Sequence, residues 1–450
     1  KGLCFNKGNL PDEKVDLISQ SLGEPRGLIN INDIPFFYDD MAAFEHRIVY
    51  YESSRGCPYR CSYCLSSIDK TVRLRDLATV KRELQYFLDH RVSQVKFVDR
   101  TFNCNHGHAT EIWKYLLEHD NGVTNFHFEI AADLLNEEEL LLLSRMRPGL
   151  VQLEIGVQSA NPETLSAIRR RMDLERLEQV VARLRSGNNI HLHLDLIAGL
   201  PYENLESFAA SFDRVYAMKP EQLQLGFLKV LKGSEMKERA EEFGICYTDK
   251  PPYEVLYTKW LEFSEVLLLK QIEEMVELYY NSNQFCNTLR FLERVFTTPF
   301  QMFRALAEFY EAEGYFIASP ARSYRYQVLH AFACRWDGAH KELYGELLAY
   351  DMYLRENLKS RPEFAKDMQE YKETMREFYR NEEEQRTYLP AYTEYDSKQL
   401  ARMTHLEPFF YPVWNPEVCG TAETARGPVF VLFDYEERNP LTGDARVTVI

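Results

Sequence analysis

The sequence lacks several features that define common protein classes. Its 450 residues contain no apolar run approaching the roughly 18 residues of a membrane-spanning helix, so we expect no membrane partner. A net charge of −16 gives no basic surface for nucleic acid, so we expect no nucleic-acid partner. No signal-peptide pattern is seen, and the nine cysteines are odd in number. Together these features predict reduced thiols and a cytoplasmic location.

Three of the cysteines nevertheless stand close together, in "GCPYRCSYCL" (56–65). Cys57, Cys61 and Cys64 are separated by three and then two residues, and no fourth cysteine accompanies them. A structural zinc site needs four ligands, and no Cys or His pair follows at zinc-finger spacing. Three thiolates can hold three irons of a 4Fe–4S cluster and leave the fourth iron open to an outside ligand. The spacing therefore predicts such a cluster, with an incomplete zinc site as the alternative.

Short β-branched and aromatic runs alternate with helical patterns from residue 47 to residue 232. Six strands are predicted, at residues 47–54, 93–100, 125–131, 150–157, 190–198 and 223–230. Strands that alternate with helices predict a parallel sheet whose right-handed crossovers put the helices outside. A doubly wound sheet and an opened barrel both satisfy this α/β pattern. A barrel carries its chemistry on loops after the strands, and the cysteine loop directly follows the first strand.

The cysteine spacing, with aromatic Tyr63 just before the last cysteine, resembles that of the radical S-adenosylmethionine (SAM) enzymes. In that family the open iron of a 4Fe–4S cluster chelates SAM, and an electron from the cluster cleaves SAM to a 5′-deoxyadenosyl radical. The resemblance implies the cluster and SAM as cofactors, and an electron donor such as flavodoxin or ferredoxin as a partner. It also implies that the six repeats form a partial (β/α)6 TIM-like barrel.

Further stretches carry the same resemblance at the predicted strand ends. In "GVQSANPETLSAIRR" the position of Gln158 matches a family glutamine that contacts the ribose, and Arg170 matches an arginine that holds the SAM carboxylate. In "DLIAGLP" the position of Asp195 matches a ribose-binding acid. Where relatives have a Gly-Gly-Glu-like turn for the SAM amino group, this chain has "VDRTFN". Asp99 and Thr101 are therefore candidates for that contact, and a helix-capping role for Asp99 is the alternative.

Two more sets of polar residues lie within predicted strands. Glu129 stands between Phe128 and Ile130, and a buried acid is costly unless it is paired, so we expect a ligand contact there, with a structural ion pair as the alternative. Alternation places His191, His193 and Asp195 on one face of their strand. Two histidines and an acid can bind a metal, but adjacent ligands on a single strand rarely surround one. We therefore expect these histidines to line the substrate side of the pocket or to be satisfied structurally.

The chain divides into three predicted regions. Residues 1–45 resemble a linker from an upstream cobalamin-binding domain, and residues 46–235 form the radical SAM partial barrel. Residues 236–450 form a mostly α-helical domain with a terminal β-hairpin (428–435 and 445–450). This last region resembles a domain of unknown function that is appended to cobalamin-type radical SAM proteins. The sequence shows no cobalamin-binding signature, so either an upstream domain outside this chain binds cobalamin or the protein works without it.

We therefore expect a radical SAM enzyme that acts on an unidentified small-molecule or peptide substrate. Cobalamin-dependent methyl transfer is the finer expectation that the resemblance adds. Two alternatives stay open. One is a methylthiotransferase-like RNA-modifying enzyme, although a second cluster domain and a basic RNA-binding domain are not seen. The other is a non-enzymatic iron–sulfur or zinc protein that uses the barrel as a scaffold.

Overall fold

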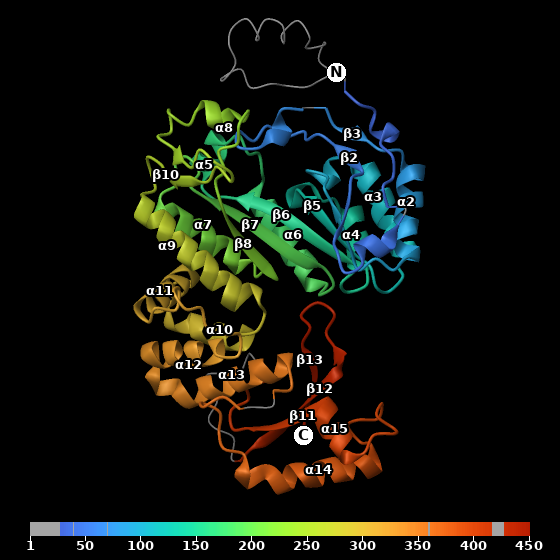
Figure 1. Ribbon diagram of the computed structural model, residues 1–450, viewed down its shortest axis with the longest axis vertical. Helices are drawn as coiled ribbons and strands as arrows, with labels where there is room; N and C mark the ends of the chain where they lie inside the picture. The colour runs from blue at the N-terminus through green and yellow to red at the C-terminus, as the bar shows by residue number, and fades with distance from the viewer. Residues whose placement is uncertain (1–27, 39, 70, 359–360, 416–426) are drawn as a thin grey trace, which may run out of the picture.

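The computed structural model describes residues 28–38, 40–69, 71–358, 361–415 and 427–450 (Figure 1). A parallel sheet flanked by helices occupies the first half of the chain, and helices with a small antiparallel sheet occupy the second. In the described residues, no helix is long and apolar enough to cross a membrane. Most of the predicted linker, residues 1–27, lies outside the described part of the chain, and the predicted domain boundaries stay predictions.

Six parallel strands form the central sheet, in the order β1-β4-β5-β6-β7-β8. Each neighbouring pair is parallel, and no pairing joins β1 to β8 among the described residues, so the barrel is open. The predicted α/β fold, a partial (β/α)6 barrel, is confirmed. The strands are β1 (Val49–Tyr51), β4 (Gln94–Phe97), β5 (Asn125–Ile130), β6 (Val151–Gln158), β7 (His191–Ala198) and β8 (Gln222–Phe227).

The helices between the strands begin at asparagine or aspartate caps. In each case the cap side chain accepts a hydrogen bond from a free backbone N–H of the first turn, which stabilises the helix start. The caps are Asp76, Asn105, Asn136, Asn161, Asp173 and Asn204. The helices are α2 (Leu77–Asp89), α3 (His106–Glu118), α4 (Glu137–Ser144), α5 (Pro162–Ala167), α6 (Leu174–Ser186) and α7 (Leu205–Ala217).

Strand alternation separates an apolar face of the sheet from a polar one. On β6, Leu153, Ile155 and Val157 are buried in the main hydrophobic core, while Glu154 and Gln158 are only partly buried. The apolar face packs on core residues of the outer helices, such as those of α6 and α7. The polar face therefore lines the inside of the open barrel, where Glu154 and Gln158 border a cavity.

The second half of the chain is mainly helical, as predicted. A short α8 (Glu235–Glu238) and a two-stranded sheet of β9 (Cys246–Tyr247) and β10 (Val255–Tyr257) lead into it. Its helices are α9 (Phe263–Met275), α10 (Cys286–Leu292), α11 (Pro299–Ala312), α12 (Arg325–Trp336), α13 (Lys341–Arg355), α14 (Lys372–Gln385) and α15 (Ser397–Met403). Strands β12 (Val429–Arg438) and β13 (Ala445–Val449) lie where the sequence predicts a hairpin, and β11 (Thr404–Phe409) adds a strand that the sequence did not predict.

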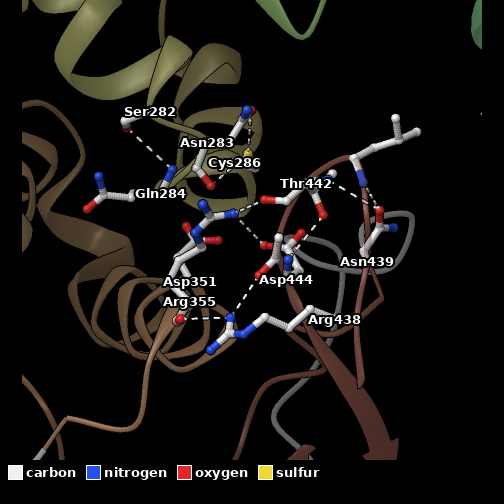
Figure 2. A network of polar contacts seen from close by, with 12 residues as sticks. Ser282, Asn283, Gln284, Cys286, Asp351, Arg355, Arg438, Asn439, Thr442 and Asp444 are labelled. Carbon is white, nitrogen blue, oxygen red and sulfur yellow. Dashed lines mark hydrogen bonds and ion pairs between the residues drawn. The ribbon is translucent and has the colours of Figure 1, made fainter. Parts of the chain in front are cut away.

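A polar network fastens this hairpin to the helices (Figure 2). Asp351 on α13 is 2% exposed and accepts hydrogen bonds from Asn287 and Thr288 at the start of α10. One turn further on, Arg355 donates to Asp444 in the turn between β12 and β13 (3.1 Å) and to the carbonyl of Thr442. The hairpin is thus held by α13.

Helices α14 and α15 lie away from the cysteine loop (Figure 1). Figure 1 shows β2 (Ser54–Arg55) and β3 (Arg73–Leu74), which flank that loop, at the opposite end of the molecule from α14 and α15. The hairpin turn approaches the loop before β6, where a Cβ added to Gly149 would lie 3.6 Å from the carbonyl oxygen of Pro440. Residues that precede β6 mark the amino end of the barrel strands. The carboxyl ends of the strands therefore stay open for a site.

Candidate active site at the carboxyl ends of the barrel strands

The cysteine loop leaves the barrel through a tight turn at Gly56. This residue has a φ of +99°, and a Cβ there would lie 2.3 Å from the carbonyl oxygen of Thr71, so only glycine fits. Backbone hydrogen bonds then fix the loop, since Ser62 N donates to the carbonyl of Ile168 (3.0 Å) and Met236 N to that of Ser62 (2.8 Å). The loop is anchored to two other parts of the barrel before any cofactor binds.

The three cysteines open into a cavity of about 320 Å³ at the carboxyl ends of the strands. All the residues that line it lie between positions 57 and 224, so the helical second half contributes none of them. Most of the site residues predicted from the sequence meet here. Asp99 does not line this cavity, nor do His191 and His193, which we expected to line the pocket or to be satisfied structurally. Those that line the cavity are Cys57, Cys61, Tyr63, Cys64, Thr101, Glu129, Gln158, Arg170 and Asp195.

Asp99 lies outside this cavity. Its side chain is fully buried and accepts hydrogen bonds from Ser53 N (2.8 Å), Ser53 Oγ (2.7 Å) and Ser54 Oγ (2.5 Å). Burial raises the pKa of Asp99 to about 6, although the serine donors oppose that shift. The helix-capping alternative does not hold either, because Asn105 caps α3. Asp99 instead fixes the chain between β1 and the cysteine loop, and the structure gives no support for its contact with SAM.

Arg170 points toward the thiols from the turn after α5. Its guanidinium donates to the carbonyl of Gly156, and its Nη1 lies 4.0 Å from Cys61 Sγ. The guanidinium also lies over the ring of Tyr59, 5.8 Å from the ring centre. Its Nε is buried without a hydrogen-bond partner among the described residues. Of the three consecutive arginines, only Arg170 lines this cavity, which places a cation beside the candidate iron ligands.

Gln158 and Asp195 bring unsatisfied oxygens to the same wall. Gln158 Oε1 and Asp195 Oδ1 are buried without a hydrogen-bond partner in the described part of the chain, although His193 Nε2 forms an ion pair with Asp195 Oδ1 at 3.0 Å. Gly156 makes room for the glutamine, because a Cβ there would lie 2.2 Å from Gln158 Nε2. A buried acceptor without a donor costs roughly 1–3 kcal/mol. These oxygens, with Arg170 and three thiols, fit a ligand that carries hydroxyl and carboxylate groups beside an iron–sulfur cluster.

Several lining residues were missed by reasoning from the sequence. Tyr59 and Arg100 line the cavity, as does Gln224 of β8. Strand alternation was the signal that could have found Gln224, because it is in register with Asp195 on β7. Tyr59 and Arg100 lie on loops, for which no periodicity exists.

The acids of β5 and β6 differ in their charge environment. Glu154 contacts Lys96 (2.9 Å) and His127 (2.8 Å). Burial alone would raise the pKa of Glu154, but these two neighbours lower it to about 2. Glu129 has only the more distant Arg100, 4.0 Å away. Burial and the adjacent Glu154 raise the pKa of Glu129 to about 7. Near neutral pH the wall therefore holds one fully charged acid and one that exchanges its proton.

Glu129→Gln is expected to stabilise the ligand-free protein at pH 8 and to have little effect near pH 4.5. The folded state binds the Glu129 proton up to a pH of about 7, whereas the unfolded state releases it near pH 4.5. The proton therefore contributes fully to the free energy of unfolding below pH 4.5, and this contribution is lost as the pH rises to 7. Glutamine imitates the protonated acid. Because the side chain is 27% exposed, we expect a gain of only about 1–2 kcal/mol.

Urea unfolding of wild type and variant at both pH values measures this difference. The matched control is Glu138→Gln, which alters an exposed glutamate on α4. The control is expected to show no such pH-dependent gain. An equal change at pH 4.5 and pH 8 would contradict the assigned titration of Glu129.

Two family models match the chain. The model of the radical SAM superfamily matches residues 51–215, which run from the last residue of β1 through the cysteine loop to most of α7. The model "Protein of unknown function (DUF4080)" matches residues 241–433, which span the helical second half and much of β12. The first match covers the elements that build the cavity, except for Gln224 of β8.

Among similar proteins, the anaerobic magnesium-protoporphyrin IX monomethyl ester cyclase of Rubrivivax gelatinosus is 25% identical over 170 residues, which is 37% of this chain and 30% of that protein. The cobalamin-dependent radical SAM methyltransferase TokK of Streptomyces tokunonensis is 25% identical over 214 residues, 45% of this chain and 31% of that protein. A solved structure of the radical SAM methyltransferase TsrM from Kitasatospora setae aligns with a TM-score of 0.42 and 20% identity, over 49% of this chain and 43% of that one. The chain thus spans under a third of the length of these two curated relatives.

Proposed function

The chain carries a radical SAM domain followed by a DUF4080 domain, and from this premise we propose that it is an enzyme that reductively cleaves SAM at a 4Fe–4S cluster. Cleavage starts radical chemistry on a substrate that the sequence does not identify. The observation that carries the proposal is the convergence of three free thiols, a half-buried arginine with an unpartnered Nε, and unsatisfied buried oxygens on one cavity. A structural cluster or a zinc site would need neither the arginine nor the unsatisfied oxygens.

In this proposal the cysteine loop holds the cluster through Cys57, Cys61 and Cys64. Burial raises the pKa of Cys57, so its thiol stays protonated until iron displaces the proton. When bound, the cluster supplies the electron that cleaves SAM. Thr101 lies 3.6 Å from Cys57 Sγ and is placed to tune that ligand through a weak hydrogen bond.

The surrounding residues bind and orient SAM. The guanidinium of Arg170 suits a carboxylate, to which it can donate two parallel hydrogen bonds. Asp195 and Gln158 offer acceptors for the vicinal hydroxyls of a ribose. Ile197 lies two residues after Asp195 on β7 and also lines the cavity, so it gives an apolar surface on the same wall. Tyr63 lies in the loop itself, between Cys61 and Cys64, two of the proposed iron ligands.

The open edge of the barrel, between β1 and β8, is the route that we propose for a small-molecule or peptide substrate. An external reductant such as flavodoxin or ferredoxin supplies the electron. Methyl transfer with cobalamin is the finer proposal, supported by the similarity to TokK over 45% of this chain. In that version cobalamin is bound by a domain outside these 450 residues, and the second half of the chain has a role other than lining the SAM cavity.

The test is anaerobic reconstitution of the full chain with iron and sulfide, followed by incubation with SAM and dithionite. We expect about four irons per chain, and 5′-deoxyadenosine with methionine as products measured by liquid chromatography. Addition of the reductant alone, without SAM, is the control. A protein that binds iron but leaves SAM intact and unbound would favour the non-enzymatic alternative.

A further inference from the structure

A second set of ligand atoms lies beside the SAM cavity, which one of its members, Glu154, also lines. His127 on β5, Glu154 on β6 and His193 on β7 each bring one nitrogen or oxygen within 4.8 Å of the others. The three strands are neighbours in the sheet, and Glu154 is in direct register with His193. The sequence pointed to His191, His193 and Asp195 as metal-type residues of one strand. In the structure the ligand atoms come from three neighbouring strands instead, so that they can bind one ion from different directions.

The two imidazoles of this set are buried and unsatisfied. His127 is 6% exposed and His193 is 5% exposed. His127 Nε2 lies 2.8 Å from Glu154 Oε2, and His193 Nε2 lies 3.0 Å from Asp195 Oδ1. Apart from these ion-pair contacts, neither Nε2 has a hydrogen-bond partner in the described part of the chain. Buried polar groups are almost always satisfied, and these nitrogens lack the partner that a ligand would supply.

Their spacing suits a metal ion. Imidazole nitrogens and carboxylate oxygens bind first-row metals at about 2.0–2.2 Å, so ligand atoms at right angles stand roughly 3 Å apart. The separation of His127 Nε2 and Glu154 Oε2, 2.8 Å, is close to that value, and all three ligand atoms lie within 4.8 Å of one another. Two histidines and one carboxylate on three strands leave further coordination positions free.

Lys96 is the competing cation. Its Nζ donates to Glu154 Oε2 at 2.9 Å, but it satisfies neither imidazole. Its side chain is 26% exposed, so the ammonium can move without being buried elsewhere. The charged groups that face this part of the barrel are Lys96, Arg100, Glu129, Glu154 and Asp195.

We infer that His127, Glu154 and His193 form a binding site for one divalent transition-metal ion, separate from the cysteine loop. The ligand set of two nitrogens and one oxygen selects zinc, iron(II), cobalt or manganese rather than magnesium or calcium, which prefer oxygen ligands. Glu154 also lines the SAM cavity, so the open positions of the metal face the space where substrate and SAM meet. The inference does not depend on the proposed SAM cleavage.

Cobalt(II) is the probe, since its visible absorption reports its ligands. The full chain with Cys57, Cys61 and Cys64 changed to Ser removes the cluster and its absorption. We expect saturable binding of one cobalt per chain, without the near-ultraviolet band that a thiolate ligand produces. A thiolate band, or no saturable binding, overturns the proposal.

Variants made in the same chain, with the three loop cysteines replaced, assign the site. His193→Gln and Glu154→Gln are expected to weaken cobalt binding more than about 100-fold, because changes even outside the ligand set cost about 10–100-fold. The control is His191→Gln, which alters a partly buried histidine on the same strand face whose ring is not among the three gathered ligands. It is expected to bind cobalt as the parent does. Equal loss in all three variants, with melting temperatures lowered alike, would mean general damage and overturn the assignment.

Two further measurements separate a metal site from an ion-pair network. Lys96→Gln is expected to bind cobalt at least as tightly as its parent. Binding that occurs only in this variant would mean that the lysine fills the site, and the proposal would be wrong. Elemental analysis of the reconstituted wild-type protein, dialysed against zinc, is expected to find one zinc beside the cluster iron, and none in His193→Gln.

Discussion

Single replacement of Cys57, Cys61 or Cys64 by alanine is expected to abolish both the iron–sulfur cluster and SAM cleavage. Each thiolate is the sole protein ligand of one iron in the proposed site, so none of the three can be spared. The loss should be complete rather than graded. Backbone hydrogen bonds at Ser62 already fix the loop, and the loop contains no further cysteine that could replace the missing ligand. The measurements are the visible absorption, the iron content and the yield of 5′-deoxyadenosine.

Cys104 provides the decisive control for this prediction. Cys104 follows β4 and lies near Cys57. Burial, and after it the charge of Cys57, raise the pKa of Cys104 to about 11. Cys104→Ala is expected to keep the cluster and SAM cleavage. If Cys104→Ala also loses iron, the cluster has four cysteine ligands and no open iron for SAM. If any of the three loop variants keeps its cluster and its activity, the ligand assignment is wrong.

The sequence was informative about the barrel because two physical signals agreed there. Apolar runs mark the strands, and capping asparagines and aspartates, such as Asn136 and Asp173, mark the starts of the helices between them. Strand β11 was missed because Pro408 interrupts its pattern and because its partner β12 is distant in sequence. Pairing between distant segments leaves no local signal in a single sequence.

The candidate site was predictable only where a residue type and its spacing carry chemistry together. The three cysteines, Gln158 and Arg170 were found in that way, and the structure brings them to one cavity. Asp99 was predicted to contact SAM, but an acid after a strand suits a ligand and a structural hydrogen bond equally well. The sequence could not show that Ser53 and Ser54 already donate to it. His127 and Glu154 were not grouped with His193 because register between strands decides that contact.

Arg170→Lys is expected to weaken SAM binding by about 10–100-fold, or about 1–3 kcal/mol, while the cluster stays intact. A lysine keeps the positive charge but offers a single ammonium in place of two parallel donors. It can still donate to the carbonyl of Gly156, which the arginine now holds, so the barrel should not be disturbed. The effect on SAM then reports the shape of the guanidinium rather than its charge. Calorimetry under argon on the reconstituted proteins measures the affinity.

The neighbouring arginine gives the matched control. Arg169 pairs with Glu235 at 2.7 Å and does not line the SAM cavity, so Arg169→Lys is expected to bind SAM as the wild type does. Arg170 is the one of the pair with a buried Nε that lacks a partner among the described residues, and a SAM carboxylate would supply an acceptor at that guanidinium. If Arg170→Lys binds SAM as tightly as Arg169→Lys does, the guanidinium does not hold the carboxylate. If it loses iron, Arg170 instead supports the cysteine loop through its approach to Cys61.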